Sequence, residues 1–193
     1  MPKPPLDHFG LLAPIYERVI RTPEAAEVEA LLELARGQVL LDVGGGTGRV
    51  TQLLQGSGAR LLLLDPSWGM LQQAQRKGCC GIAQGTAERL PFVDGCLERI
   101  VAVDSFHHFW NHAAAAKELV RVLAPGGRLV IEEFDVRRFA VRLVALGEKL
   151  AWMRSRFFAP EELAALFRAP GVSVRLHCPQ KSHVYWAIVE KPE

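Results

Sequence analysis

A short apolar run near the start of the chain leads directly into a glycine-rich turn and then into a helical pattern. The run covers residues 39–43, which are apolar except for Asp42, and the glycines that follow it are Gly44, Gly45, Gly46 and Gly48. Glycine lets the backbone turn sharply and approach a ligand closely. The amino end of a helix after such a turn offers N–H groups to an anion or a carboxylate. The stretch therefore predicts a buried strand, a ligand-binding turn and a helix, the opening unit of an α/β protein.

Apolar strand patterns alternate with helical patterns along the rest of the chain. Strands are expected at residues 39–43, 60–64, 80–83, 99–103, 128–132, 172–177 and 183–189. The alternation predicts an α/β fold, a Rossmann-like three-layer sandwich around a seven-stranded, mostly parallel sheet. The turn at residues 179–181 would join the last two strands as a hairpin. We therefore expect the strand order 3-2-1-4-5-7-6, with strand 7 antiparallel.

An acidic residue follows the second predicted strand, where a nucleoside ligand of such a sheet would need it. Asp65 stands 17 positions after Gly48, and a carboxylate there can accept hydrogen bonds from ribose hydroxyls. A dinucleotide fingerprint, G-x-G-x-x-G, would place its third glycine at position 49, which is Arg49. The observed G-x-G-x-G spacing favours an adenosine-type cofactor. A nicotinamide-dependent oxidoreductase remains the alternative.

Five ordered motifs across residues 38–134 resemble those of class I S-adenosylmethionine-dependent methyltransferases. They are the glycine loop with Asp42 before it, and the stretches at residues 64–71, 85–92, 104–109 and 118–127. The chain is most similar to the small-molecule branch that includes the ubiquinone and menaquinone C-methyltransferases. Phe9, Ala13 and Tyr16 match the opening motif of that branch. The branch usually carries Arg-Asn near the position of His107-His108, and this departure argues against a quinone acceptor.

The resemblance implies that the cofactor is S-adenosyl-L-methionine and the product S-adenosyl-L-homocysteine. Asp42 would help to place the amino group of the cofactor, and Asp65 would hold the ribose. The cofactor-binding residues implied in this way are Tyr16, Asp42, Gly44, Gly45, Gly46, Asp65, Pro66, Met70, Thr86, Ala87, Glu88, Asp104 and Ser105. Many relatives have aspartate where Thr86 stands, so we expect somewhat weaker cofactor binding here.

Methyl transfer from a sulfonium requires alignment and, for some acceptors, removal of a proton. His107 and His108 follow the fourth predicted strand and are the candidate catalytic bases, because histidine titrates near neutral pH. Equally, one of them caps the next helix or packs against Trp110.

We expect one methyltransferase domain over residues 1–193, with an N-terminal helical cap at 1–36 and a lid at 136–158. As a lid, this segment would present an apolar face, with arginines that bind an anionic acceptor or a membrane surface. The alternative is an ordinary helix whose apolar face packs on the core.

The composition limits the kinds of molecule that the chain is expected to bind. The formal net charge is +2, which argues against nucleic acid and favours a small-molecule methyl acceptor. There is no run of 18 apolar residues and no secretory pattern, so we expect a cytoplasmic protein, monomer or homodimer, without a membrane span. The four cysteines lack metal-ligand spacing, so no metal is expected. A domain of the same fold that binds the cofactor without catalysis is a further alternative.

Overall fold

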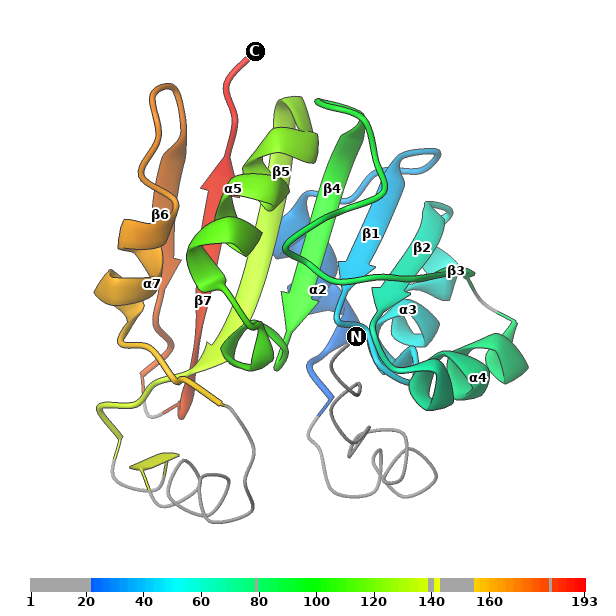
Figure 1. The fold of residues 1–193 in the computed structure, drawn as a ribbon, viewed down its shortest axis with the longest axis horizontal. Coiled ribbons are helices and arrows are strands. Elements are labelled where there is room, and N and C mark those ends of the chain that lie inside the picture. The colour runs from blue at the N-terminus through cyan, green and yellow to red at the C-terminus, as the bar shows by residue number, and fades with distance from the viewer. Residues whose placement is uncertain (1–21, 79, 139–140, 143–154, 181) are drawn as a thin grey trace, which may run out of the picture.

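The structure is a computed structural model that describes residues 22–78, 80–138, 141–142, 155–180 and 182–193. Its centre is one seven-stranded sheet in the order β3-β2-β1-β4-β5-β7-β6 (Figure 1). The strands are β1 (Val39–Val43), β2 (Arg60–Asp65), β3 (Gly81–Gln84), β4 (Leu97–Val103), β5 (Leu123–Phe134), β6 (Ser173–His177) and β7 (Val184–Glu190). Only β7 runs antiparallel to its two neighbours. The predicted order and the antiparallel last strand are both confirmed.

Helices cover both faces of this sheet. One face carries α5 (His112–Val122) and α7 (Pro160–Leu166), and the other carries α2 (Ala25–Leu32), α3 (Arg49–Leu53) and α4 (Trp68–Lys77) (Figure 1). Short 3₁₀ turns form η2 (Gln55–Ser57) and η3 (Phe106–His108). Residues 1–21 of the predicted helical cap and most of the predicted lid lie outside the described residues. The three layers of the predicted sandwich are present.

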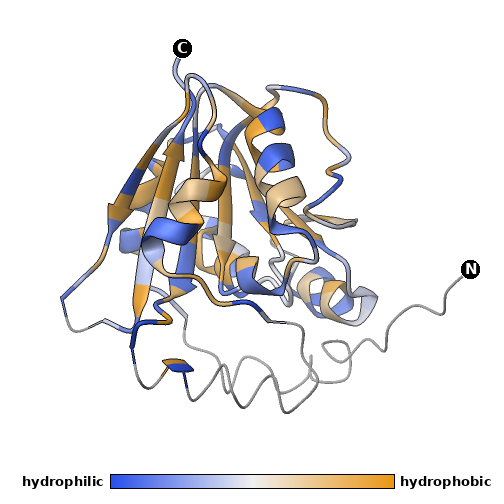
Figure 2. Ribbon diagram, turned by 60° about the vertical axis from the view of Figure 1, so that its left-hand side comes forward, coloured by the Kyte–Doolittle hydropathy of each residue, from blue (hydrophilic) through white to orange (hydrophobic). Residues whose placement is uncertain are grey.

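The central strands are apolar along their length because both of their faces are buried. In β4, Ile100 and Ala102 pack in the cluster under α5 and α7, while Val101 and Val103 pack in the cluster under α2 and α3. The same continuity makes the strands the most hydrophobic part of the chain in Figure 2. Strands covered on both sides read as unbroken apolar runs, which is what a parallel sheet between helices requires.

Several strands begin or end one or two residues from their predicted bounds, and the start of β5 differs most. Helix α3 begins at Arg49, directly after Gly48, which has a left-handed backbone with φ 76°. Strand β5 begins at Leu123 and not at Arg128. The glycine-containing segment in between stays extended because it pairs with the chain after β7, where the Gly126 amide donates to the Lys191 carbonyl at 2.9 Å. Local sequence could not show this pairing, because its partner lies about 65 residues further along.

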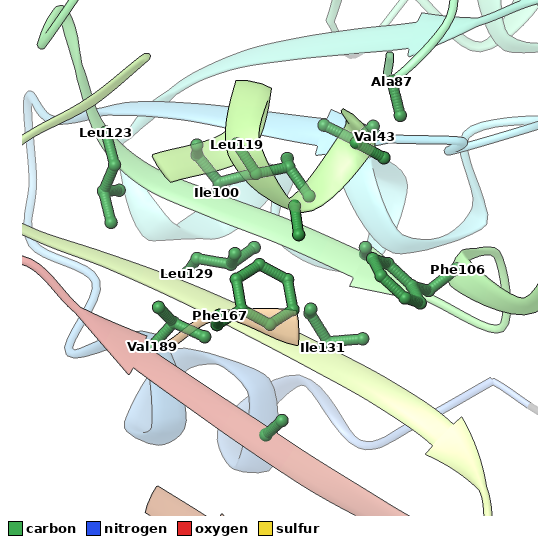
Figure 3. Close-up of a cluster of buried hydrophobic side chains, with 14 of the residues drawn as sticks. Val43, Ala87, Ile100, Phe106, Leu119, Leu123, Leu129, Ile131, Phe167 and Val189 are labelled. Atoms are coloured by element: carbon green, nitrogen blue, oxygen red, sulfur yellow. The ribbon is translucent and has the colours of Figure 1, made fainter. Parts of the chain in front are cut away.

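The aromatic ring of Phe106 fills the core at the carboxyl end of β4. It is fully buried and lies close to Val43 and Ile131, as Figure 3 shows. Its ring centroid is 5.9 Å from that of Phe158 and 5.8 Å from that of Phe167. Because Phe106 precedes the two histidines of η3, this packing anchors the segment that carries them.

We expect Phe106→Ala to lower the free energy of unfolding by about 3–5 kcal/mol, since it removes a buried ring and leaves a cavity. Urea denaturation followed by circular dichroism measures the change. The matched control is Val93→Ala, at a side chain that is 73% exposed, which should change stability by less than about 0.5 kcal/mol. Equal effects of the two substitutions would show that the ring is not a core anchor.

Candidate cofactor site

The glycine turn after β1 lies at the carboxyl edge of the sheet and has a backbone that suits glycine. Gly44 and Gly46 have φ angles of 70° and 56°, in the left-handed region. A Cβ atom on Gly44 would lie 2.7 Å from Cβ of Ser105, so the turn packs directly on the loop after β4. At Gly46 the nearest neighbour of such an atom would be Met70 Sδ at 3.8 Å, so this glycine faces open space. The turn thus has one packed side and one accessible side.

Asp65, at the end of β2, connects the glycine turn to the start of α4. Its Oδ2 accepts a hydrogen bond from the Gly46 amide at 2.9 Å, and its Oδ1 accepts one from the Ser67 amide at 2.8 Å. These two bonds fix the orientation of the carboxylate beside the turn. Asp65 therefore lies where the sequence placed it, beside the accessible side of the turn.

The residues expected around the adenine lie on the loop after β2, in the first turn of α4 and on the loop after β3. Pro66 and Thr86 are exposed, whereas Met70 and Ala87 are buried. Glu88 has a structural contact that the sequence did not indicate, because its Oε1 accepts hydrogen bonds from the Trp110 and Asn111 amides at 2.7 and 3.2 Å. It thereby joins the loop after β3 to the start of α5. Tyr16 lies outside the described residues.

Asp42 is buried beneath the glycine turn. Its Oδ2 has no hydrogen-bond partner among the described residues, and a Cβ atom on Gly45 would lie 2.7 Å from it. Burial is the main cause that raises the pKa of Asp42 to about 7, against a lowering by the charge of Arg49. Asp42 thus supports the turn from inside, and at neutral pH it is about half protonated.

A buried ion pair bridges the glycine turn and the end of β4. Arg49 Nη2 lies 2.7 Å from Asp104 Oδ2, and both side chains are more than nine-tenths buried. Asp104 also has a left-handed backbone, with φ 49°. Next to it, Ser105 Oγ donates to the Val43 carbonyl at 2.9 Å. Burial raises the pKa of Asp104, and the neighbouring Arg49 opposes that rise. The sequence identified Asp104 and Ser105 here but not the role of Arg49.

His107 is held by a carboxylate that sequence analysis missed. Its Nδ1 lies 2.8 Å from Glu133 Oε2, and its backbone amide donates to Glu133 Oε1 at 3.0 Å. Glu133 is fully buried at the end of β5, and the Phe157 ring stacks on His107 with centroids 4.5 Å apart. The signal available in the sequence was a pair of acidic residues closing an apolar strand, which is an unusual place for buried charge.

His108 occupies a different environment from its neighbour. Its Nδ1 lies 3.0 Å from Ser155 Oγ, and its ring centroid is 4.0 Å from that of His107. Burial, with the charge of His107, lowers the pKa of His108 to about 2. The two histidines that the sequence could not separate are therefore chemically distinct, since His108 stays neutral.

Two cavities border the sheet at opposite ends. One of about 280 Å³ is lined by Thr22, Arg49, Gln52 and Leu53, beside the ion pair. Another of about 520 Å³ lies at the amino ends of β4 and β5, where Arg128 is paired with Glu190. The second cavity is far from the glycine turn, and its arginine is already neutralised. The first one borders the turn.

Within the described part of the chain, no three His, Cys, Asp or Glu side chains gather as a metal site would require. In the same part, every helix is too short or too polar to cross a membrane.

Residues 41–131 match the family described as a methyltransferase domain. The demethylmenaquinone methyltransferase of Mycolicibacterium vanbaalenii is 38% identical over 104 residues, covering 54% of this chain and 45% of that protein. The chain thus spans about half the length of the curated relatives that it matches.

Solved structures agree on the fold. A methyltransferase from Thermotoga maritima, described as a possible histamine N-methyltransferase, has a TM-score of 0.78 and 24% identity, covering 95% of this chain and 97% of its own. A methyltransferase from Aquifex aeolicus has a TM-score of 0.65 and 20% identity, covering 86% and 88%.

These matches identify the class that the fold and the site define. The chain has the fold of class I S-adenosylmethionine-dependent methyltransferases, and residues 41–131 match the methyltransferase-domain family. Among curated proteins it is similar to the menaquinone-type methyltransferases. The cofactor that the family match implies is S-adenosylmethionine, in agreement with the glycine spacing and against a nicotinamide dinucleotide.

Asp42 should make stability depend on pH. Its folded-state pKa of about 7 lies above the ordinary value of 3.8, so the folded chain holds a proton that the unfolded chain loses as pH rises from about 4 to 7. The Asp42 contribution to the free energy of unfolding should fall over that window, by up to about 1.4 kcal/mol per pH unit. Between pH 5 and pH 7, the free energy of unfolding measured by urea denaturation should fall less in Asp42→Asn than in the unmodified chain. Parallel pH profiles for the two proteins would contradict the assignment.

Proposed function

We propose that this chain transfers a methyl group from S-adenosylmethionine to a small organic acceptor. The observation that carries the proposal is the convergence of the glycine turn, Asp65 and Asp104 at the carboxyl edge. They meet where the strand order reverses between β1 and β4. Open α/β sheets bind their ligands at such a reversal. The free thiols of Cys96 and Cys178 are in keeping with a reducing, cytoplasmic location.

The arrangement suits the parts of the cofactor in turn. Asp65 would accept hydrogen bonds from the ribose, and the open face of Gly46 would let the backbone approach the ligand. The adenine would lie between Pro66 and Met70 of α4 on one side and the loop that carries Thr86 and Ala87 on the other. Gly44, Gly45, Asp42, Asp104 and Ser105 would surround the amino-acid end. When bound, the cofactor supplies a methyl group that its sulfonium has already activated.

The chain must then orient the acceptor and accept its proton. His107 is the better placed of the two histidines to act as a base. Its Nδ1–H would donate to the Glu133 carboxylate, so the neutral ring would carry its lone pair on Nε2. His108 is a poor base because burial disfavours its charged form. The Phe157 ring covers His107, so residues 155–158 would have to shift for an acceptor to reach it. This fits the proposal that residues 136–158 form a lid. The lid and the helical cap at 1–36 would then close together over a single domain.

The acceptor class follows from charge and from the named relatives. The net charge of +2 offers little attraction to nucleic acid. One relative is named for demethylmenaquinone, and one structural neighbour is described as a possible histamine N-methyltransferase. A panel of quinols, phenols and primary amines is therefore the first set of acceptors to test, with S-adenosylhomocysteine formation as the readout. Turnover of at least one panel member separates an enzyme from a binding module of the same fold.

Asp65→Ala should weaken binding of S-adenosylhomocysteine by about 1.5–3 kcal/mol, the range for hydrogen bonds to a charged group. Isothermal titration calorimetry measures the affinity, and circular dichroism shows whether the variant is folded. Asp94→Ala, at an exposed carboxylate remote from the carboxyl edge, is the matched control and should bind normally. A folded Asp65→Ala with unchanged affinity would remove Asp65 from the ribose role.

His107→Gln should lower kcat by about 10²–10⁴-fold for an acceptor that must lose a proton, the usual contribution of a general base. His108→Gln is the matched control and should cost less than about tenfold, since the ring it removes stays neutral. Affinity for S-adenosylhomocysteine should be the same in both variants. A larger loss in His108→Gln than in His107→Gln would reverse the assignment.

A further inference from the structure

Arg156 carries a positive charge that the described part of the chain leaves without a counter-ion. Its side chain is exposed, and within the described residues it forms no ion pair and donates no hydrogen bond. By contrast, Arg49 pairs with Asp104 at the same edge of the sheet, and Arg137 pairs with Asp135 just after β5. The surroundings of Arg156 therefore decide whether its charge has a use.

Arg156 is held against the segment that carries the histidines. Its backbone amide donates to the His107 carbonyl at 2.9 Å, and its guanidinium carbon lies 4.8 Å from the centre of the Phe158 ring. Phe158 is itself buried, and its carbonyl accepts a hydrogen bond from Tyr185 Oη at 3.3 Å. A cation–π contact needs no hydrogen-bond acceptor, so the N–H donors of the guanidinium remain available. The charge thus lies in a defined position beside His107 and can bind a ligand.

An aromatic slot between His107 and Phe134 adjoins Arg156, and the Phe157 ring fills it. This ring stacks on His107, with centroids 4.5 Å apart and planes inclined by 19°, and it meets the Phe134 ring edge-on at 6.2 Å. Phe134 ends β5 and His107 belongs to η3, so two ordered elements form the sides of the slot. A flat ring of similar size fits there once the Phe157 side chain turns out. The shift needed at residues 155–158 can be confined to this side chain, with the Arg156 amide still on the His107 carbonyl.

The other ionisable groups near the slot do not compete for an anion or for the guanidinium. Glu133 is bound to His107, and Glu88 accepts the amides at the start of α5. Burial is the main cause that lowers the pKa of His112, and the charge of Arg156 acts in the same direction, so this ring stays neutral. A ligand carboxylate would therefore meet Arg156 without displacing an acidic side chain.

We propose that the methyl acceptor is an aromatic carboxylate: its ring occupies the slot between His107 and Phe134 in place of Phe157, and Arg156 binds its carboxylate. The inference rests on the proposed function and names the substrate class of the same site. Arginine can bind both oxygens of a carboxylate through two parallel N–H bonds, which fixes the direction in which the ring enters. The ring then lies against His107, the candidate base.

Calorimetric titration into the complex of the chain with S-adenosylhomocysteine tests the assignment without any turnover. The probes are 4-hydroxybenzoate and 4-hydroxybenzamide, which have nearly the same shape and differ in charge. The unmodified chain should bind the carboxylate about tenfold more tightly than the amide, because a hydrogen bond between two charged groups is the stronger one. This preference should shrink as sodium chloride is added, since salt screens an exposed charge.

Arg156→Gln should remove the preference, so that the two probes bind within about twofold of each other, with unchanged affinity for S-adenosylhomocysteine. Arg156→Lys keeps the charge without the bidentate geometry and should keep part of the preference. Arg76→Gln, an exposed change on α4, is the matched control and should bind both probes as the unmodified chain does. Phe157→Leu leaves more room in the slot and should bind 4-hydroxybenzoate at least as tightly as the unmodified chain.

Each outcome decides a separate question. If the unmodified chain does not bind S-adenosylhomocysteine, the proposed function itself fails. If it binds S-adenosylhomocysteine but binds neither probe, or binds both equally, the acceptor class is overturned and the proposed function stands. A preference that survives in Arg156→Gln overturns the role of Arg156. Weaker binding of 4-hydroxybenzoate in Phe157→Leu overturns the slot, because the Phe157 ring would then be a contact of the acceptor and not a group that the acceptor replaces.

Discussion

The central strands are buried on both faces, and the rest of the molecule follows from this constraint. Leu41 and Val43 of β1 pack under one layer of helices, and Leu40 packs under the other. Polar side chains along such strands would lose their water with no partner to replace it. Chemistry is therefore confined to the strand ends, and the parallel order brings several carboxyl ends to one edge.

Ionisable groups at that edge are buried to a degree that stability does not require. Asp42, Arg49, Asp104, His107 and Glu133 are each more than nine-tenths buried. Arg49 pairs with Asp104, and His107 pairs with Glu133. The carboxyl group of Asp42 lies beneath the glycine turn, outside these two pairs. Each pair joins a loop to the end of a different strand, so the charges fix the loops relative to each other. A site built in this way is rigid before any ligand arrives, which reduces the entropy lost on binding.

The two histidines show how neighbouring residues of one type acquire different chemistry. A buried carboxylate holds His107 at Nδ1, whereas a hydroxyl faces His108. Burial, with the charge of His107, lowers the pKa of His108, so the His108 ring stays neutral. The glycine turn and Asp65 indicate which class of cofactor the chain binds. The methyl acceptor depends on the surroundings of the two histidine rings. The family match stops at residue 131, before the segments expected to cover them.

The sequence by itself determined the strand order, the glycine turn and the position of Asp65, because these depend on local patterns with a fixed period or spacing. The run from Leu40 to Gly48 already contains its strand, turn and helix start. Only the tertiary structure decided which charges meet. Glu133 reaches His107 across 26 positions, and Arg49 reaches Asp104 across 55. Such pairs form where the sheet brings distant strand ends together, and no local pattern of residues encodes that distance. The same holds for β5, whose early start at Leu123 depends on a partner segment near the other end of the chain.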